Sequence, residues 1–185
     1  MSTPVLVRAS DYIEQSAMLQ QGWNWMALNV KPVNMSLSGI FGSVDHKSVV
    51  LKNDIGFSVP TDATADIWNG TVDSLKIGKM YKLRMKESAE LLISGRKVNP
   101  ADVTVPITQN WNWIAYVPRF NMTVDEALSG LEAVENDMIK GQTQFAVYEN
   151  GAWVGSLRSL VPGRGYLYYS GDNMPKSFIY PSVSS

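Results

Sequence analysis

The chain has 185 residues, no cysteine, and a formal net charge of -1 from 17 acidic and 16 basic residues. Its 45% hydrophobic content is enough to bury a core, and its length allows one ordinary domain or two small ones. The lack of cysteine excludes a disulfide framework and thiolate chemistry, and the lack of a basic run disfavours nucleic acid or an anionic membrane as a partner.

Residues 1–12 are predicted to form an N-terminal arm before the first folded unit. The only apolar run there, Val5 to Val7, is too short for the hydrophobic region of a signal peptide. No later segment approaches the ~18 apolar residues of a membrane span. We therefore expect no export signal and no membrane span in the chain as given.

The first unit, residues 13–95, is predicted to be mostly strand. A β-prone run, residues 13–19, leads through a turn into the phrase GWNWMAL, in which Trp23, Trp25 and Ala27 alternate with the residues between them. This period of two places the three on one side of a strand. Because both sides are partly apolar, the strand is predicted to lie in the centre of its sheet.

Each unit carries one helical signal after this phrase. In the second unit Thr123 is a good N-cap, and Glu126 three residues later completes a capping box before apolar residues at helical spacing. The first unit keeps Ser36 as the cap but has Gly39 in place of the glutamate. We expect a short helix in each unit, the first weaker than the second.

Further strands are predicted on both sides of a linker at residues 96–102. The sequence ENGA at residues 149–152 predicts a tight hairpin turn, because Asn-Gly tolerates the positive φ that such turns need. The expected strands are 48–52, 56–59, 66–72, 79–85 and 89–94 in the first unit, and 103–108, 138–140, 144–148, 152–157, 165–169 and 176–181 in the second.

The two units are predicted to be copies of one another. One nearly constant offset in residue number superposes the aromatic residues of the two, with only small gaps. The matched pairs are Trp23 with Trp111, Trp25 with Trp113, Trp68 with Trp153, and Tyr81 with Tyr166. We therefore predict a mainly β fold of two tandem small β-roll or partly open barrel domains, 13–95 and 103–185, each with one short helix.

The string NDMIKGQTQFAVYENGAWVGSLRSLVPGRGYLYYS, residues 136–170, resembles a module of large surface and secreted proteins of Bacteroidales. The resemblance covers nearly the whole chain from about residue 13 and extends to the tandem arrangement. It rests on the Trp-Asn-Trp phrase, the short helix, Trp-x-Gly-Ser-Leu and Pro-Gly-x-Gly-Tyr, in that order. The first copy departs from the pattern, with Ile-Gly-Lys-Met-Tyr in place of the last motif. The resemblance implies an extracellular setting and no catalytic residue.

The sequence gives little support for catalysis, a metal or a cofactor. His46 is the only histidine, so a histidine dyad lacks an evident partner. Asp62, Asp66 and Asp73 lack the regular spacing of a calcium loop. We predict no catalytic, metal-binding or cofactor-binding residue, and a protein that is not an enzyme.

The aromatic residues have two interpretations. They form either the hydrophobic core of each unit or an exposed surface on which sugars or a partner protein stack. Repetition in both copies favours a core, because each copy must rebuild its fold. The predicted repeat core is Trp23, Trp25, Trp68, Tyr81, Trp111, Trp113, Trp153 and Tyr166. Aromatics found only in the second unit are the candidate partner contacts: Tyr116, Phe120, Tyr148, Tyr168 and Tyr169.

The sequence favours a non-catalytic structural and interaction module of an extracellular assembly. Two settings stay open, a piece of a bacterial cell-surface protein and a structural subunit of a phage virion, which lysis would release without a signal peptide. The expected partners are other protein subunits or the remainder of a larger surface protein. The alternative is a carbohydrate-binding module that uses exposed aromatic residues.

Overall fold

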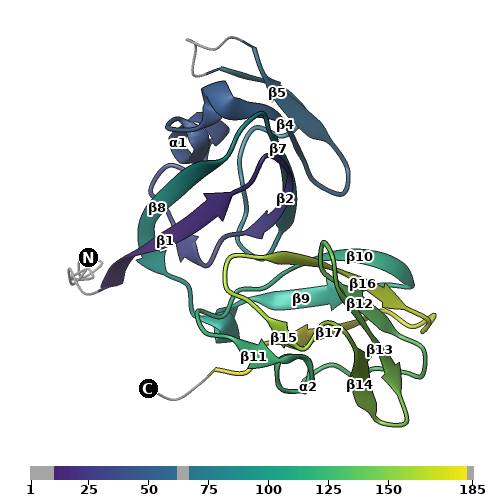
Figure 1. Ribbon diagram of the computed structural model, residues 1–185. Coiled ribbons are helices and arrows are strands. Elements are labelled where there is room, and N and C mark those ends of the chain that lie inside the picture. Colours follow the sequence, from purple (N-terminus) through teal and green to yellow (C-terminus); the bar gives the residue numbers. More distant parts are fainter. Residues whose placement is uncertain (1–10, 62–66, 183–185) are drawn as a thin grey trace.

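The computed structural model describes residues 11–61 and 67–182 (Figure 1). Nearly all of the predicted N-terminal arm lies outside these residues. So do Asp62 and Asp66, two of the three aspartates considered above for calcium. The described chain is mainly β with two short α-helices, and its sheets fall into two halves. The predicted fold class is confirmed.

Each half contains one open antiparallel sheet of five strands. In spatial order, the first sheet consists of β2 (Gly22–Ala27), β7 (Met80–Met85), β4 (Ser48–Lys52), β5 (Phe57–Pro60) and β6 (Trp68–Gly70). The second consists of β10 (Asn110–Ala115), β16 (Gly165–Ser170), β12 (Met138–Lys140), β13 (Phe145–Glu149) and β14 (Ala152–Gly155). Strands that are equivalent in the repeat occupy equivalent places, so the two sheets share one topology.

Smaller elements complete each half. One sheet has the order β1 (Tyr12–Leu19), β8 (Ala89–Lys97), β3 (Val30–Lys31), and two pairs join β9 (Thr104–Ile107) to β17 (Lys176–Ile179) and β11 (Met122–Thr123) to β15 (Ser159–Leu160). The helices are α1 (Leu37–Phe41) and α2 (Val124–Ala127), with 3-10 turns η2 (Asp45–Lys47) and η3 (Pro100–Asp102). Strand β8 thus runs two residues into the predicted linker, and η3 forms its last three residues.

Local signals in the sequence account for the turns and helix starts. The capping box is confirmed: the Thr123 hydroxyl accepts from the Glu126 amide, and the Glu126 carboxylate accepts from the Thr123 amide. Ser36 caps α1 through the Gly39 amide. The predicted hairpin turn is confirmed by positive φ at Asn150 and the glycine after it.

The Trp-Asn-Trp phrase forms strand β2 in the first half and β10 in the second. The predicted alternation is present, but the predicted central position is wrong, because both strands are the first strand of their sheet. Ala27 at the end of β2 is buried against the core of the second half. The apolar character of both sides of β2 therefore reflects contact between the halves.

The middle asparagine of the phrase holds its own turn. The Asn24 side chain accepts from the Gln20 amide at 2.8 Å and donates to the Gln20 carbonyl oxygen at 2.8 Å. Asn112 makes the same pair of bonds with Thr108, at 2.9 and 2.7 Å. In both halves the asparagine points inward and forms hydrogen bonds with backbone groups of the preceding turn. It is thus the residue of the phrase that stabilises the fold.

The contacts between the halves are reciprocal: an element of one half contacts the same position in the other half that its own equivalent contacts in return. Strand β2 contacts β16, and its equivalent β10 contacts β7, which is the equivalent of β16. Gly163, with φ +74°, packs so closely on Gln15 that an added Cβ would lie 2.9 Å from its Nε2. Gly78, with φ +83°, is in the same relation to Val103, the residue equivalent to Gln15. The halves are therefore related by an approximate two-fold axis, like the subunits of an isologous dimer.

Candidate functional site

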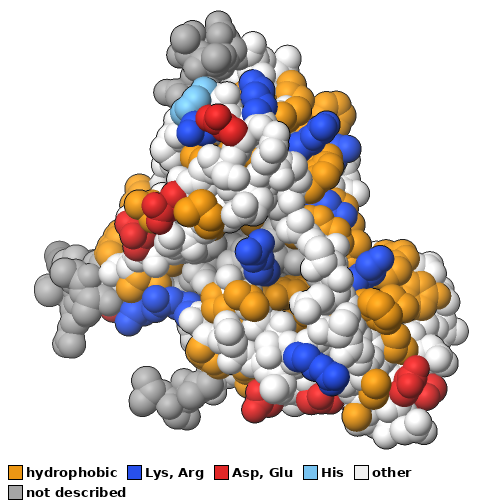
Figure 2. All heavy atoms as spheres, viewed as in Figure 1, with side chains coloured by type: hydrophobic (Ala, Val, Ile, Leu, Met, Phe, Trp, Pro, Cys, Tyr) orange, Lys and Arg blue, Asp and Glu red, His pale blue; other side chains and the backbone are white. Residues whose placement is uncertain are grey.

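The outer surfaces of the two five-stranded sheets carry tryptophans and lysines side by side. Residues on this side of the strands alternate with the buried ones, as the register of the ladders requires. We define the tryptophan–lysine face by Trp23, Trp25, Lys52, Lys82, Trp111, Trp113 and Lys140. In Figure 2, hydrophobic and basic side chains follow one another down the right-hand side of the molecule across both halves.

Lys82 joins the two halves of this face. Its ammonium nitrogen lies 4.2 Å from the ring centre of Trp25 in its own half and 4.1 Å from that of Trp113 in the other. The remaining lysines lie at longer range, Lys52 at 5.4 Å from Trp23 and Lys140 at 5.7 Å from Trp111. Each ammonium is within the ~6 Å over which a ring face attracts a cation.

The charges on this face repel one another. Lys52 and Lys82 are directly opposite in the pairing of β4 with β7, an arrangement that disfavours like charges. Burial lowers the pKa of Lys82, and the positive charges of Lys140 and Lys52 lower it further. Among the described strand residues on this side, Glu149 at a hairpin tip is the one acidic residue. The face therefore has a local excess of positive charge.

The predicted repeat core is wrong for the four tryptophans of the two phrases. Trp23 is 38% exposed and Trp111 is 47% exposed, while Trp25 and Trp113 are half-buried under Lys82. The reason is the asparagine between them, which occupies the inward position. The prediction is confirmed for Tyr81, Trp153 and Tyr166, which are buried. Trp68 is half-buried and packs against the core of the first half.

Two of the predicted partner contacts, Tyr116 and Tyr168, are wrong because both side chains are fully buried. Tyr168 pairs with Asn112 on the inward side of β16, and its hydroxyl donates to the Asp137 carboxylate at 2.5 Å. Burial and this bond raise its pKa. The Tyr116 hydroxyl donates to the Phe120 carbonyl oxygen at 2.9 Å, and burial raises the pKa of Tyr116 also.

The other three predicted contacts divide between core and face. Phe120 and Tyr148 are half-buried and pack against the second core. Tyr169 alone lies on the outer side of its sheet, where its ring is 5.3 Å from that of Trp111. Of the five candidate contacts, Tyr169 is therefore the one that adjoins the tryptophan–lysine face.

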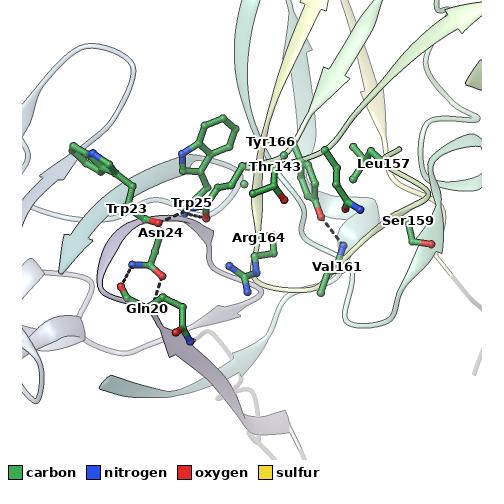
Figure 3. Close-up of a pocket in the computed structure, with 14 residues that line it drawn as sticks. Gln20, Trp23, Asn24, Trp25, Thr143, Leu157, Ser159, Val161, Arg164 and Tyr166 are labelled. Atoms are coloured by element: carbon green, nitrogen blue, oxygen red, sulfur yellow. Dashed lines mark hydrogen bonds between the residues drawn. The ribbon is translucent and has the colours of Figure 1, made fainter. Parts of the chain in front are cut away.

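A cleft of about 350 Å³ lies beside this face, between the two halves. Its volume is at the lower end of the range of about 300 to 1,000 Å³ found for small-molecule sites. Figure 3 shows Gln20 and Asn24 of the first half around the same space as Thr143 and Arg164 of the second, with the Asn24 side chain turned toward Gln20. Trp23 and Trp25 line the same space, so the cleft and the face share two residues.

Hydrogen bonds across the junction shape this cleft. Gln142, in the turn after β12, accepts from the Trp25 amide at 2.9 Å and donates to the Trp23 carbonyl oxygen at 2.7 Å. The Ala27 amide donates to the Gly163 carbonyl oxygen at 3.0 Å. The outer edge of β2 is thus satisfied by the second half, and the cleft wall is fixed from both sides.

Within residues 11–61 and 67–182, no group of three or more histidine or acidic side chains is placed to hold a metal ion. His46 is on the surface at η2, next to Asp45. In the described chain, no helix has the length and apolar character needed to cross a membrane.

Comparison of the chain with protein-family models, curated proteins and solved structures finds no match. The fold and the site define a mainly β protein of two equivalent open-sheet halves with one aromatic and basic face across both. The function is therefore argued from that face.

Proposed function

We propose that the chain is a non-catalytic structural and interaction module of an extracellular assembly, and that the tryptophan–lysine face is its contact surface. The setting is either a bacterial cell-surface protein or a phage virion. The observation that carries the proposal is the exposure of Trp23 and Trp111 at equivalent positions on two sheets. Exposed indoles are typical of binding surfaces, where tryptophan is among the residues that contribute most of the binding energy.

The resemblance of residues 136–170 to the Bacteroidales module supports the extracellular setting. The rigid arrangement supports an interaction role, because Lys82 and Gln142 hold the two halves of the face in one geometry. A preorganised face loses little conformational entropy on binding.

The first test is the mass of the chain in solution by light scattering, with negative-stain images of the same fractions. We expect either discrete assemblies or a monomer that binds a partner, with binding lost in the double variant Trp23→Ser, Trp111→Ser. The matched control, Met18→Ser with Leu92→Ser, removes two exposed apolar side chains from the three-stranded sheet. Equal behaviour of the two double variants, or turnover of a substrate, would contradict the proposal.

The adjoining cleft favours carbohydrate binding as the second candidate function. Its lining combines indole rings with neutral amides and hydroxyls, from Gln20, Gln142, Thr143, Gln144 and Ser159. Such groups donate and accept hydrogen bonds in the way that sugar hydroxyls require. A sugar bound there would change the tryptophan fluorescence, and the Trp23→Ser variant would reduce that change, because Trp23 and Trp25 are the indoles that line the cleft.

A further inference from the structure

We infer that the tryptophan–lysine face and its cleft bind an acidic polysaccharide, whose sugar rings lie on the indoles and whose carboxylates lie between the ammonium groups. This inference rests on the proposed function, because it names the ligand of the same surface. It is carried by the placement of the lysines, the neutral amide groups of the cleft, and the extent of the face across both halves.

The lysines supply the charge complementarity. Lys52, Lys82 and Lys140 take part in none of the ion pairs of the described residues, which involve His46, Lys47 and Lys176. Lys52 and Lys82 nevertheless stand opposite each other on adjacent strands. A bound carboxylate between two such ammonium groups removes their repulsion and gains charge-assisted hydrogen bonds.

The aromatic groups favour an anionic ligand that contains sugar rings over an anion that lacks them. Ring faces carry negative potential, which attracts the polarised C–H groups on the flat side of a pyranose as it attracts the lysines. Trp23 and Trp111 are the most exposed indoles of the face and occupy equivalent positions in the two halves. Two equivalent stacking positions suit a ligand that is itself a repeating chain.

The cleft provides the groups that separate a polysaccharide from an acidic peptide. Gln20, Thr143 and Gln144 are exposed there and present neutral donors and acceptors, which match sugar hydroxyls. Arg164, also exposed at the cleft, offers the planar fork that fits a carboxylate. A surface for acidic peptides would need cations throughout, whereas here they alternate with indoles and amides.

The test is titration of the full chain with oligomers of galacturonate, mannuronate and hyaluronan, followed by tryptophan fluorescence and calorimetry. The methyl ester of each oligomer is the matched neutral ligand, and poly-glutamate is the matched acidic peptide. We expect binding of at least one acidic oligomer, weakened by salt and weakened about tenfold or more in its methyl ester.

Two double variants with the same change in charge locate the site. Lys52→Gln with Lys140→Gln is expected to weaken binding about tenfold, because two cations leave the face. Lys31→Gln with Lys97→Gln, two exposed positions on the three-stranded sheet, is expected to change it less than about twofold. An equal effect of both variants would overturn the inference, and so would equal affinity for the methyl ester.

The outcomes separate this inference from the proposed function. If none of the acidic oligomers binds, or poly-glutamate binds equally well, the assignment to a polysaccharide is wrong. Assembly or partner binding that still depends on Trp23 and Trp111 would then leave the contact surface in place. If those variants also have no effect, both proposals are wrong.

Discussion

Gln142, in the second half, donates its side-chain amide to the carbonyl oxygen of Trp23, in the first half, over 2.7 Å. The same side chain accepts from the Trp25 amide, so it occupies the place of a neighbouring strand at the edge of β2. An unpaired strand edge invites pairing with other chains, and this contact removes two of its free groups. One glutamine thus serves both the junction and the wall of the cleft.

Replacing Gln142 by alanine is expected to lower the free energy of unfolding by about 1 kcal/mol. The variant loses the hydrogen bonds of this side chain to the Trp25 amide and the Trp23 carbonyl oxygen, and both exposed backbone groups then bond to water. Chemical denaturation followed by circular dichroism measures this change. Gln144→Ala is the control, since that side chain is exposed two residues away in the same turn. If the two variants have the same stability, the bond across the junction contributes nothing.

The repeat and most strand positions could be predicted because they depend on local pattern and internal comparison. The hairpin at Asn150, the cap at Thr123 and the period of two in the Trp-Asn-Trp phrase all depend on neighbours in sequence. These signals identified which residues share a side of a strand. They could not identify which side faces the core, because indoles are found both in cores and at binding surfaces.

The site could be predicted only in part, because it depends on how the halves meet. Lys82 contacts Trp113 through the junction, and nothing in the sequence near either residue indicates that approach. The sequence could have indicated Lys52 and Lys140 as part of the site, because they are equivalent in the repeat and lie on the same side of their strands as the tryptophans. Conversely, Tyr168 was misplaced because its partner Asp137 has no counterpart in the first half, where Val49 stands.

Asp137 is expected to be the most sensitive polar residue of the second half. Its carboxylate is fully buried and accepts from the amides of Val134 and Gly171, at 3.1 and 2.8 Å, and from the Tyr168 hydroxyl. Lys176 lies 3.7 Å away. Asp137→Ala should lower the free energy of unfolding by about 3 to 5 kcal/mol, because several buried donors lose their acceptor and Lys176 loses one of its two carboxylate partners.

A double-mutant cycle with Tyr168→Phe isolates the hydroxyl bond from the rest. The single variant Tyr168→Phe is expected to cost about 1.5 to 3 kcal/mol, and its cost should largely vanish in the Asp137→Ala background. Asp172→Ala is the control, because Asp172 also pairs with Lys176 but lies at the surface. Additive effects of Asp137 and Tyr168 would show that their contact is not coupled.

Tyr180 and Tyr116 should respond oppositely to loss of their hydroxyl groups. The rings are 5.2 Å apart in the second core, but the Tyr180 hydroxyl is buried without a hydrogen-bond partner among the described residues. Tyr180→Phe is therefore expected to be neutral or to stabilise the fold by up to about 1 kcal/mol, whereas Tyr116→Phe should cost about that much. Thermal unfolding of the two variants, each equally conservative, decides the point. Equal destabilisation by both would mean that Tyr180 has a partner.

Stability is expected to fall as the pH rises above about 10, where tyrosines ionise in the unfolded chain. Burial raises the pKa of five of the eight tyrosines, which are Tyr81, Tyr116, Tyr166, Tyr168 and Tyr180. Above pH 10 the unfolded state has lost these protons and the folded state retains them, so unfolding releases protons and becomes more favourable with pH.

Near-ultraviolet absorbance after a jump to alkaline pH measures this linkage directly. The tyrosinate signal of the buried group should develop at the same rate as the loss of structure, followed in parallel by circular dichroism. Urea denaturation between about pH 8 and about pH 11 should show a free energy of unfolding that decreases over the same range. Immediate ionisation of all eight tyrosines in a chain that keeps its circular dichroism would show that the five hydroxyls are accessible, contrary to their burial.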